Sequence, residues 1–293
     1  PVRIGAAVTF TAPVVLACCN RLWNFQPTRH LTAENAADVQ PVTFENTRTA
    51  APAEVGGDIR IAGFNVLNYF TTLGEDIAGC EAYEDRDGDG NNVRTGCDQR
   101  GAWDPQDLQR QQEKIVSAIN TLDADVVGLM EIENSAALGE EADEATEALV
   151  AALNAAAGEQ KWAANPSSSE LPAASEQDVI TNAIIYKPAA VERVGEARAL
   201  GDQSAGGQAF GNAREPIGQV FAPVEGGEEF LFVVNHFKSK GSGTDDGTGQ
   251  GNANPDRIAQ AALAALANSA QNAGIVRNEL EDHAELLRAK YDI

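Results

Sequence analysis

The chain lacks several features that would place it in a membrane or on an anionic partner. Its 293 residues contain no apolar run of about 18 residues, the length that a membrane-spanning helix requires. No secretion signal is present, and the first residues, PVRIGAAVTF, begin inside a strand-like pattern, as if an upstream segment had been removed. We therefore predict no membrane span, and we infer no protein partner from the sequence.

Positive charge is scarce beside negative charge. The chain has 21 Lys and Arg residues against 44 Asp and Glu residues, which gives a formal net charge of −23, and only six residues are lysine. Such an acidic surface favours solubility and repels nucleic acid at long range. A polyanionic substrate would therefore need a local group of basic residues, bound cations or screening salt.

Cysteine is also rare, with four residues in the chain. Cys80 and Cys97 flank one polar loop, and a disulfide between them would suit an oxidising compartment. Cys18 and Cys19 are adjacent, so that in a strand their side chains point to opposite faces and make poor partners for each other. Burial of these two as small hydrophobic residues is an equally good interpretation.

The patterns along the chain change character after residue 57. Residues 1–57 contain short strand-like runs and the linker-like AAPAEVGG, which indicates the end of a small β module. Residues 58–293 alternate buried-strand patterns with helical patterns and then give a run of strands, which favours one layered α+β domain. The strand patterns cover 59–70, 124–134, 178–188, 191–200, 217–224 and 228–237.

Three helices are predicted in the second region, at 104–122, 144–158 and from residue 254. Asp104 is a candidate N-cap, and Pro105 suits a first helical turn. Gly158 is a suitable C-terminal stop for the second helix.

Polar residues stand where three of the apolar strand patterns end. Asn65 closes the first pattern, Glu131 and Glu133 close the second, and Asn235 and His236 close the last. Ligand sites of layered α/β proteins collect at the carboxyl ends of strands. A carboxylate and an amide oxygen suit a hard cation such as Mg²⁺, and histidine transfers protons near neutral pH. The pattern therefore favours metal-assisted phosphate chemistry.

Four motifs carry a family resemblance: FNVLNYF, DVVGLMEIEN, DVITNAIIYKP and VVNHFKSKG, in this order. They resemble the motifs of the endonuclease/exonuclease/phosphatase superfamily, and most of all its secreted bacterial extracellular deoxyribonuclease branch. The resemblance covers residues 57–267. It implies a four-layer α/β/β/α sandwich preceded by a small β module, and a secreted nuclease that hydrolyses DNA, or RNA, with little sequence specificity.

The resemblance also implies roles for individual residues. Asn65 matches the asparagine near the catalytic metal, and Glu131 matches the glutamate that ligates Mg²⁺ or Mn²⁺. His236 matches the histidine that contacts the scissile phosphate and takes part in proton transfer. Asp178 matches a residue that orients groups of the site. The candidates for contact with the substrate are Arg214, Asn235, Lys238 and Lys240.

Two motifs of the family are missing from the sequence. The family has an Asp-x-Asn after a later strand and an Asp-His pair near the end of the domain. Here the tail 268–293 departs from the pattern, and residues 272–293 have the pattern of a charged amphipathic helix. Asp282 and His283 spell the late dipeptide in this helical setting, which favours a surface position. The domain is thus expected to be incomplete at its C-terminal end, as a fragment, a truncated product or a domain completed by a partner.

The loop between Cys80 and Cys97 has its own acidic pattern. Asp85, Asp87 and Asp89 alternate before Gly90, as at the start of a calcium-binding loop, although the twelfth position is glycine rather than the glutamate of an EF-hand. A structural Ca²⁺ loop closed by the disulfide and a solvated acidic turn are both open.

Two further functions compete with the nuclease hypothesis. The same fold acts on phosphomonoesters or phospholipid headgroups in other proteins, because fold does not fix the substrate. A catalytically inactive calcium-binding extracellular module is the third possibility, which the missing motifs favour.

Overall fold

The computed structural model describes residues 2–19, 21–49, 51–204 and 206–272. The chain divides into two compact units, Pro1–Glu54 and Val55–Ile293, where the sequence pattern predicts the boundary after residue 57. The segment 273–293, which holds Asp282 and His283, lies outside the described residues.

The first unit consists of two antiparallel strand pairs and one helical turn. Strand β1 pairs with β4, and β2 pairs with β3 in a hairpin. Cys18 on β2 is exposed, so burial as a small hydrophobic residue is wrong for this cysteine. The elements of the unit are β1 (Val8–Phe10), β2 (Val14–Cys19), β3 (Leu22–Pro27), α1 (Ala36–Val39) and β4 (Val42–Phe44).

The second unit contains two sheets packed face to face. One sheet has the strand order β5-β8-β10-β9, and the other has the order β11-β12-β13. The strands are β5 (Ile61–Tyr69), β8 (Val126–Glu133), β9 (Ala163–Ala164), β10 (Ile180–Tyr186), β11 (Val191–Ala199), β12 (Ile217–Pro223) and β13 (Phe230–Val234).

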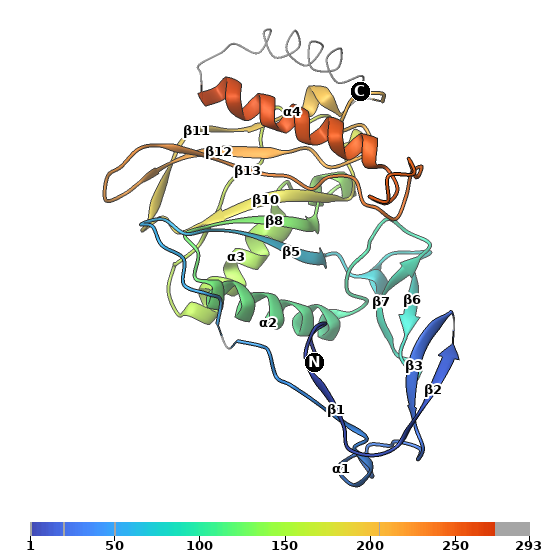
Figure 1. The fold of residues 1–293 in the computed structure, drawn as a ribbon. Coiled ribbons are helices and arrows are strands. Elements are labelled where there is room, and N and C mark those ends of the chain that lie inside the picture. The colour runs from blue at the N-terminus through green and yellow to red at the C-terminus, as the bar shows by residue number, and fades with distance from the viewer. Residues whose placement is uncertain (1, 20, 50, 205, 273–293) are drawn as a thin grey trace. The chain divides into compact units, whose positions relative to one another are not determined.

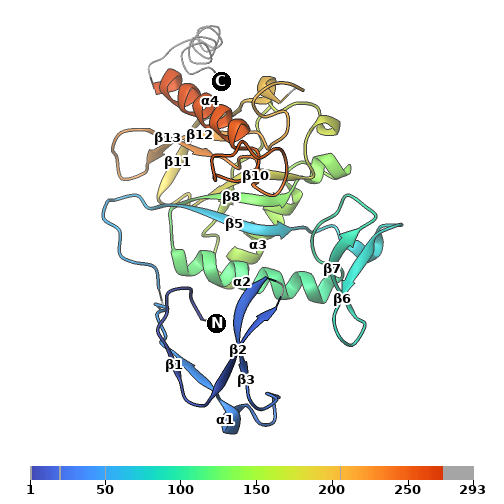
Figure 2. The same cartoon turned by 45° about the vertical axis from the view of Figure 1, so that its right-hand side comes forward.

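Helices cover the two outer faces of this pair of sheets. Helices α2 (Pro105–Leu122) and α3 (Glu144–Ala157) pack on the β5–β8–β10 sheet, and α4 (Asn254–Asn272) packs on β13 (Figures 1 and 2). The order of layers is therefore helix, sheet, sheet, helix. This confirms the predicted α+β class and the predicted α/β/β/α sandwich. Short 3-10 turns occur at Gly74–Asp76, Ser135–Leu138, Ala174–Glu176 and Gly201–Gln203.

The helix ends follow the signals in the sequence. The Asp104 carboxylate accepts a hydrogen bond from the Asp107 backbone N–H at 2.9 Å, and Pro105 stands in the first turn of α2. Such an N-cap stabilises a helix by about 1 kcal/mol. Helix α3 ends at Gly158, whose φ of 72° is the left-handed conformation that glycine adopts without strain.

Two apolar cores lie on the two faces of β8, and a third, smaller cluster contains Phe210 and Leu263 of α4. Alternate residues of this strand face the helices or the second sheet, which explains why its pattern is apolar throughout. Each fully buried aliphatic side chain contributes about 1.5–3 kcal/mol. The helix-side core includes Val66, Ile119, Val127, Leu129, Ile132, Leu149 and Leu153, and the core between the sheets includes Val126, Ile184, Val191, Ile217, Phe221 and Val234.

A partly buried ionic cluster lies at the end of the first sheet where β8 begins and β10 ends. Lys187 Nζ donates to Asp123 Oδ1 at 2.8 Å and lies 3.4 Å from Asp125 Oδ1. Lys161 and Arg60 also donate to the Asp123 carboxylate, at 2.9 and 3.0 Å. The hydrogen bonds from Lys187 and Lys161 hold the pKa of Asp123 well below its usual value.

A small hairpin follows β5 and precedes α2 in the sequence. It consists of β6 (Glu81–Glu84) and β7 (Gly90–Thr95), and Cys80 and Cys97 at its base form the predicted disulfide.

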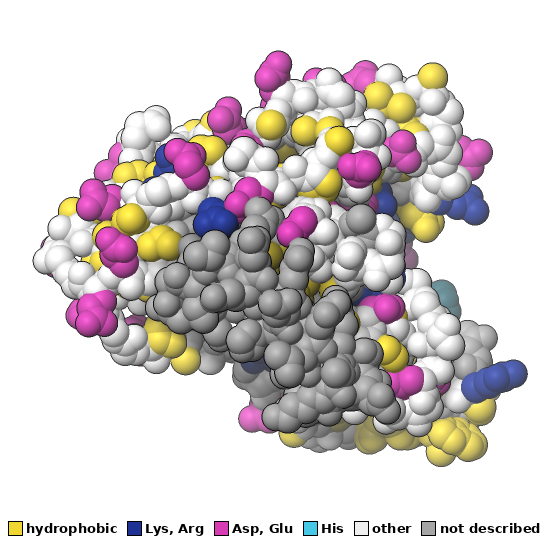
Figure 3. Space-filling model, turned by 90° about the horizontal axis from the view of Figure 1, so that it is seen from above, with side chains coloured by type: hydrophobic (Ala, Val, Ile, Leu, Met, Phe, Trp, Pro, Cys, Tyr) yellow, Lys and Arg dark blue, Asp and Glu magenta, His cyan; other side chains and the backbone are white. Residues whose placement is uncertain are grey.

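The part of the chain that the structure describes contains no helix of the length and apolarity needed to span a membrane. Figure 3 shows acidic side chains scattered over the face seen from above rather than gathered in one patch.

Candidate active site

Several strand ends meet at one end of the two sheets, which we call the strand edge. Strand β5 runs parallel to β8, whereas β10 runs antiparallel, so that the ends of β5 and β8 and the start of β10 lie together. In the facing sheet, the last residue of β13, Val234, pairs with the first residue of β12, Ile217. Residues just after β13 and just before β10 or β12 therefore converge at this edge.

Glu131 reaches this edge because of a β-bulge. The pairing of β8 with β10 shifts so that Glu131 has no partner between Met130 and Ile132, and its φ is +61°. The extra residue keeps Ile132 on the helix side, where Leu129 already lies, and frees Glu131 to turn toward the second sheet. A non-glycine residue in this conformation costs about 1–3 kcal/mol and is common at functional sites. The strand ends at Glu133, so the prediction that Glu131 and Glu133 close it is confirmed for Glu133, and Glu131 lies two residues inside the end.

Asn65 also lies within a strand rather than at its end, contrary to the prediction. Strand β5 continues to Tyr69, but its pairing with β8 breaks after Asn65 and resumes at Tyr69. Asn65 is paired with Met130, the neighbour of Glu131. Its side-chain oxygen accepts a hydrogen bond from the Leu67 N–H at 2.8 Å, and Leu67 and Asn68 both have positive φ.

His236 is brought to Glu131 from the opposite sheet. The two side chains approach to 3.5 Å, from Nε2 to Oε1. Burial and the positive charge of Arg214 lower the pKa of His236, while Glu131 and Asp178 act in the opposite direction. The His236 Nδ1 and Asn235 Oδ1 atoms are buried without a hydrogen-bond partner among the described residues. Unpaired buried polar atoms are rare, so each of these two is an unusual feature of the segment after β13.

Asp178 lies between two arginines at the same edge. Arg100 Nη2 donates to Asp178 Oδ1 at 2.9 Å, and Arg214 Nη1 lies 3.9 Å from Oδ2. Arg214 is buried and donates through Nη2 to the backbone oxygens of His236 and Phe237, at 3.0 and 3.1 Å. Burial lowers the pKa of Arg214, and its Nε has no partner among the described residues. In this structure Arg214 therefore holds the backbone on which His236 stands.

The predicted basic pair is less tightly placed. Lys238 is half-buried and Lys240 is exposed, and neither ammonium group has an ion pair with a described residue. The backbone around them is fixed by Gln260 of α4, which is fully buried. Its side chain accepts from the Lys238 N–H at 2.9 Å and donates to the Ala209 oxygen at 2.9 Å. Contact of these lysines with phosphate stays a prediction.

Glu133 has a structural role, because it fixes neighbouring backbone by hydrogen bonds. It is buried and accepts hydrogen bonds from the Thr72 N–H at 2.9 Å and the Ser135 hydroxyl at 3.0 Å. Burial, together with the Glu133 charge, raises the pKa of Tyr69 to about 12. Glu133 thus holds the segment after β5 and is separate from the Glu131–His236 pair.

The acidic loop forms the turn of the β6–β7 hairpin. Asp85, Asp87 and Asp89 are exposed, and Asp85 Oδ1 accepts from the backbone N–H groups of Asp87 and Asp89, at 2.8 and 3.1 Å. No set of three or more His, Cys, Asp or Glu side chains within the described residues is arranged to hold a metal ion. A Ca²⁺ ion here stays a prediction.

The donors at the strand edge suit a hard divalent cation. Glu131 supplies a carboxylate, Asn65 supplies an amide, and Asn235 has a buried amide oxygen without a partner among the described residues. Oxygen donors of this kind fit Mg²⁺ or Mn²⁺, and a bound ion at this place stays a prediction.

Sequence reasoning missed three residues of this edge. Arg100 contacts Asp178, 78 residues away in sequence, and nothing local to Arg100 indicates this contact. Asn182 is buried within β10 and donates to the Glu215 oxygen at 2.8 Å, and Gln260 holds the loop after β13. The sequence does contain a signal for Asn182 and for Gln260. Asn182 is a polar residue in the apolar run ITNAIIY, and Gln260 is a polar residue on the apolar face of α4.

No family model and no curated protein matches the chain. Solved structures that align with part of it include a functionally unknown conserved protein from Enterococcus faecalis V583, with 16% identity over 55% of this chain and 51% of that chain and a TM-score of 0.33. An endonuclease/exonuclease/phosphatase family protein from Bacteroides thetaiotaomicron aligns with 14% identity over 44% and 45% and a TM-score of 0.28.

The human Nocturnin catalytic domain with bound sulfate anion aligns with 16% identity over 56% of this chain and 54% of that chain, with a TM-score of 0.31. The chain thus matches about half the length of each of these three solved structures.

Proposed function

We propose that the chain is a secreted, divalent-metal-dependent nuclease of the endonuclease/exonuclease/phosphatase superfamily that hydrolyses phosphodiester bonds of DNA with little sequence specificity. The observation that carries the proposal is the approach of Glu131 and His236 to 3.5 Å from two facing sheets. Both residues belong to the motifs on which the family resemblance rests, and they meet although 105 residues (236 − 131) separate them.

In this proposal Glu131 and Asn65 would hold Mg²⁺ or Mn²⁺, which would supply neutralisation of the charge on the phosphate. Burial and the charge of Arg214 lower the pKa of His236, which favours the neutral imidazole, the form that can accept a proton or donate an N–H to a phosphate oxygen. Arg214 fixes the backbone of His236, and Asp178 balances the charge of Arg214.

Binding of the phosphate backbone requires local positive charge in a chain of net charge −23. Arg100, Lys238 and Lys240 supply it in this proposal, since each leaves a cationic group at or near the edge where the strands end. The disulfide between Cys80 and Cys97 suits an oxidising, extracellular setting.

Plasmid cleavage tests the proposal. Supercoiled plasmid is incubated with the protein and Mg²⁺, with and without EDTA, and nicked and linear forms are followed on a gel. We expect nicking that EDTA abolishes and that His236→Ala reduces by a factor of about 100 or more. His30→Ala is the matched control, because it removes an exposed histidine of the first unit and should leave the rate unchanged.

The same preparation separates the competing functions. Turnover of p-nitrophenyl phosphate without plasmid cleavage would replace the nuclease by a phosphatase of the same fold. Calcium binding, measured by calorimetry, with no turnover of either substrate would favour an inactive calcium-binding module.

A further inference from the structure

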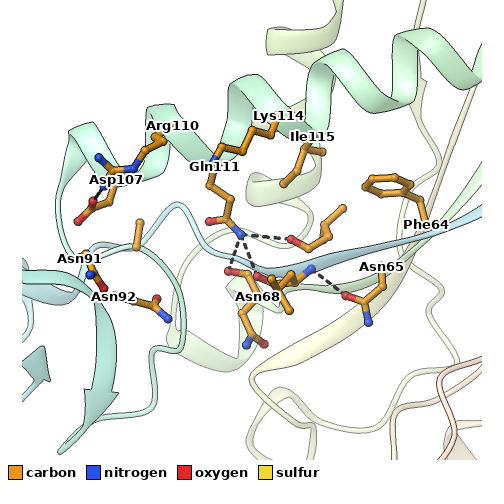
Figure 4. A pocket seen from close by; sticks show the side chains of 13 residues that line it. Phe64, Asn65, Asn68, Asn91, Asn92, Asp107, Arg110, Gln111, Lys114 and Ile115 are labelled. Carbon is orange, nitrogen blue, oxygen red and sulfur yellow. Dashed lines mark hydrogen bonds and ion pairs between the residues drawn. The ribbon is translucent and has the colours of Figure 1, made fainter. Parts of the chain in front are cut away.

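A cavity of about 510 Å³ lies beside Asn65, on the other side of β5 from the second sheet. Its walls are the irregular part of β5, the strand β7 of the disulfide-closed hairpin, and one face of α2 (Figure 4). Its volume falls in the range of small-ligand sites, about 300–1,000 Å³. Asn65 belongs to both the cavity and the candidate active site, so that the two are neighbours.

The cavity wall carries positive charge that the chain has in short supply. Arg110 and Lys114 both line it from α2. Lys114 is exposed and makes no hydrogen bond or ion pair with a described residue. Arg110 contacts the Asp107 carboxylate, whose other oxygen is buried without a hydrogen-bond partner among the described residues. The cavity thus offers a free ammonium group next to an incompletely satisfied ion pair.

Amides and apolar side chains form the rest of the wall. Figure 4 shows Asn91 and Asn92 toward one end of the cavity and Phe64 and Ile115 toward the other. The Asn91 and Asn92 side chains are exposed, whereas Gln111 is fully engaged with β5, donating to the Leu67 oxygen at 2.8 Å. Amides offer both donors and acceptors to a base edge, and an aromatic or aliphatic wall accommodates a base face.

The shape of the cavity is held by well-defined contacts. The Gln111 amide also lies within hydrogen-bond distance of the Val66 and Asn68 oxygens, at 3.2 and 3.4 Å, so that α2 fixes the irregular backbone of β5. On the other side, β7 is anchored by its hairpin partner and by the Cys80–Cys97 disulfide. A site built on fixed walls loses less entropy when it binds a ligand.

We propose that this cavity binds one nucleotide of the substrate strand, next to the nucleotide whose phosphate is cleaved. Lys114 contacts the phosphate, and the amides of Asn91 and Asn92 contact the base or sugar. The proposal deepens the nuclease function and rests on it, because the cavity adjoins the candidate active site through Asn65. It predicts that the protein prefers polynucleotides to small phosphate esters.

Binding of a fluorescein-labelled single-stranded oligothymidylate in EDTA, measured by fluorescence anisotropy, tests the cavity without catalysis. Lys114→Gln should weaken binding about fivefold at low salt and reduce the slope of log K against log salt by about 0.7, the value for one phosphate contact on a single strand. Asn91→Trp should weaken binding by filling the cavity, with an unchanged slope, because it removes no charge.

Arg193→Gln is the matched control, since it removes an exposed positive charge on β11 in the other sheet and should change binding less than twofold. Circular dichroism verifies that each variant is folded. The cavity proposal is overturned if both cavity variants bind as the wild type does, or if the wild type does not bind the oligonucleotide.

The plasmid assay keeps the two proposals distinguishable. Plasmid cleavage combined with unaltered binding by Lys114→Gln and Asn91→Trp would remove the cavity and leave the nuclease function. Loss of binding by these variants, without cleavage by the wild type, would retain the nucleotide site and remove the nuclease function.

Discussion

The bulge at Glu131 allows the effect of its strained backbone on stability to be measured separately from the effect of its carboxylate on metal binding. Glu131→Ala removes the carboxylate but keeps a Cβ at φ +61°, whereas Glu131→Gly removes both. Left-handed backbone costs an L-residue about 1–2 kcal/mol and glycine almost nothing. Glycine loses about 0.5–1 kcal/mol through its greater freedom in the unfolded chain. We therefore expect the glycine variant to be more stable than the alanine variant by about 1 kcal/mol.

The assay is urea unfolding followed by circular dichroism, with equal m values as the condition for comparing midpoints. The expected difference corresponds to a shift of about 2–4 °C in the melting temperature of a unit of this size. Ala151→Gly is the internal control, because Ala151 is exposed in the middle of α3. At that helical position glycine should lower the free energy of unfolding by about 1 kcal/mol relative to alanine, whereas at position 131 it should raise it.

Two results would refute this reasoning. If Glu131→Ala equals or exceeds Glu131→Gly in stability while Ala151→Gly behaves as expected, the backbone at Glu131 is not left-handed. If titration calorimetry finds the Mg²⁺ affinity of Glu131→Ala unchanged, Glu131 does not belong to the metal site. If Glu131→Gly is more stable than Glu131→Ala but binds Mg²⁺ more weakly than the wild type, the strained backbone at residue 131 is retained for metal binding.

Three further outcomes are expected. Replacing Cys80 and Cys97 together by serine should lower the free energy of unfolding by about 3 kcal/mol, from the entropy of the closed loop, and reduced wild type should match the variant in urea unfolding. Lys187→Met should cost about 2–3 kcal/mol, because it removes the buried ammonium group that pairs with both Asp123 and Asp125; unaltered stability would mean that this ammonium group does not stabilise the fold. Because the pKa of Asp123 is lowered in the folded state, its stabilising contribution is present above about pH 4 and is lost as the pH falls further; Asp123→Asn should flatten this part of the stability profile, by a small amount since the carboxylate is 42% exposed.

The helices and most strands of the second unit were predictable because their signals are local. Asp104 and Pro105 begin α2, Gly158 ends α3, and apolar runs mark the buried strands. The order of layers was predictable only through the family resemblance, because periodicity alone does not say which faces of two sheets meet.

The meeting of Glu131 and His236 was predicted, but the means by which Glu131 gets there was not. A bulge inserts one residue into a strand without changing its composition, so the run VVGLMEIE reads as a continuous strand. The same applies to Asn65, where the strand continues beyond an irregular segment that Gln111 of α2 stabilises. At Asn65 the irregular backbone is held both by the local hydrogen bond from the Leu67 N–H to the Asn65 side chain and by the distant Gln111, which the local sequence does not indicate.

All groups assigned to chemistry lie at one rim of the sandwich, which leaves part of the opposite rim free for engineering. There the segment 224–229 connects β12 to β13, with exposed residues and two glycines, Gly226 and Gly227, in left-handed conformation. An affinity handle or a fluorophore attached in this connection would be held at the far end of the β12–β13 pair from His236. Protein immobilised through this connection would leave the end of the sandwich that carries Glu131 and His236 accessible to long polymers in solution.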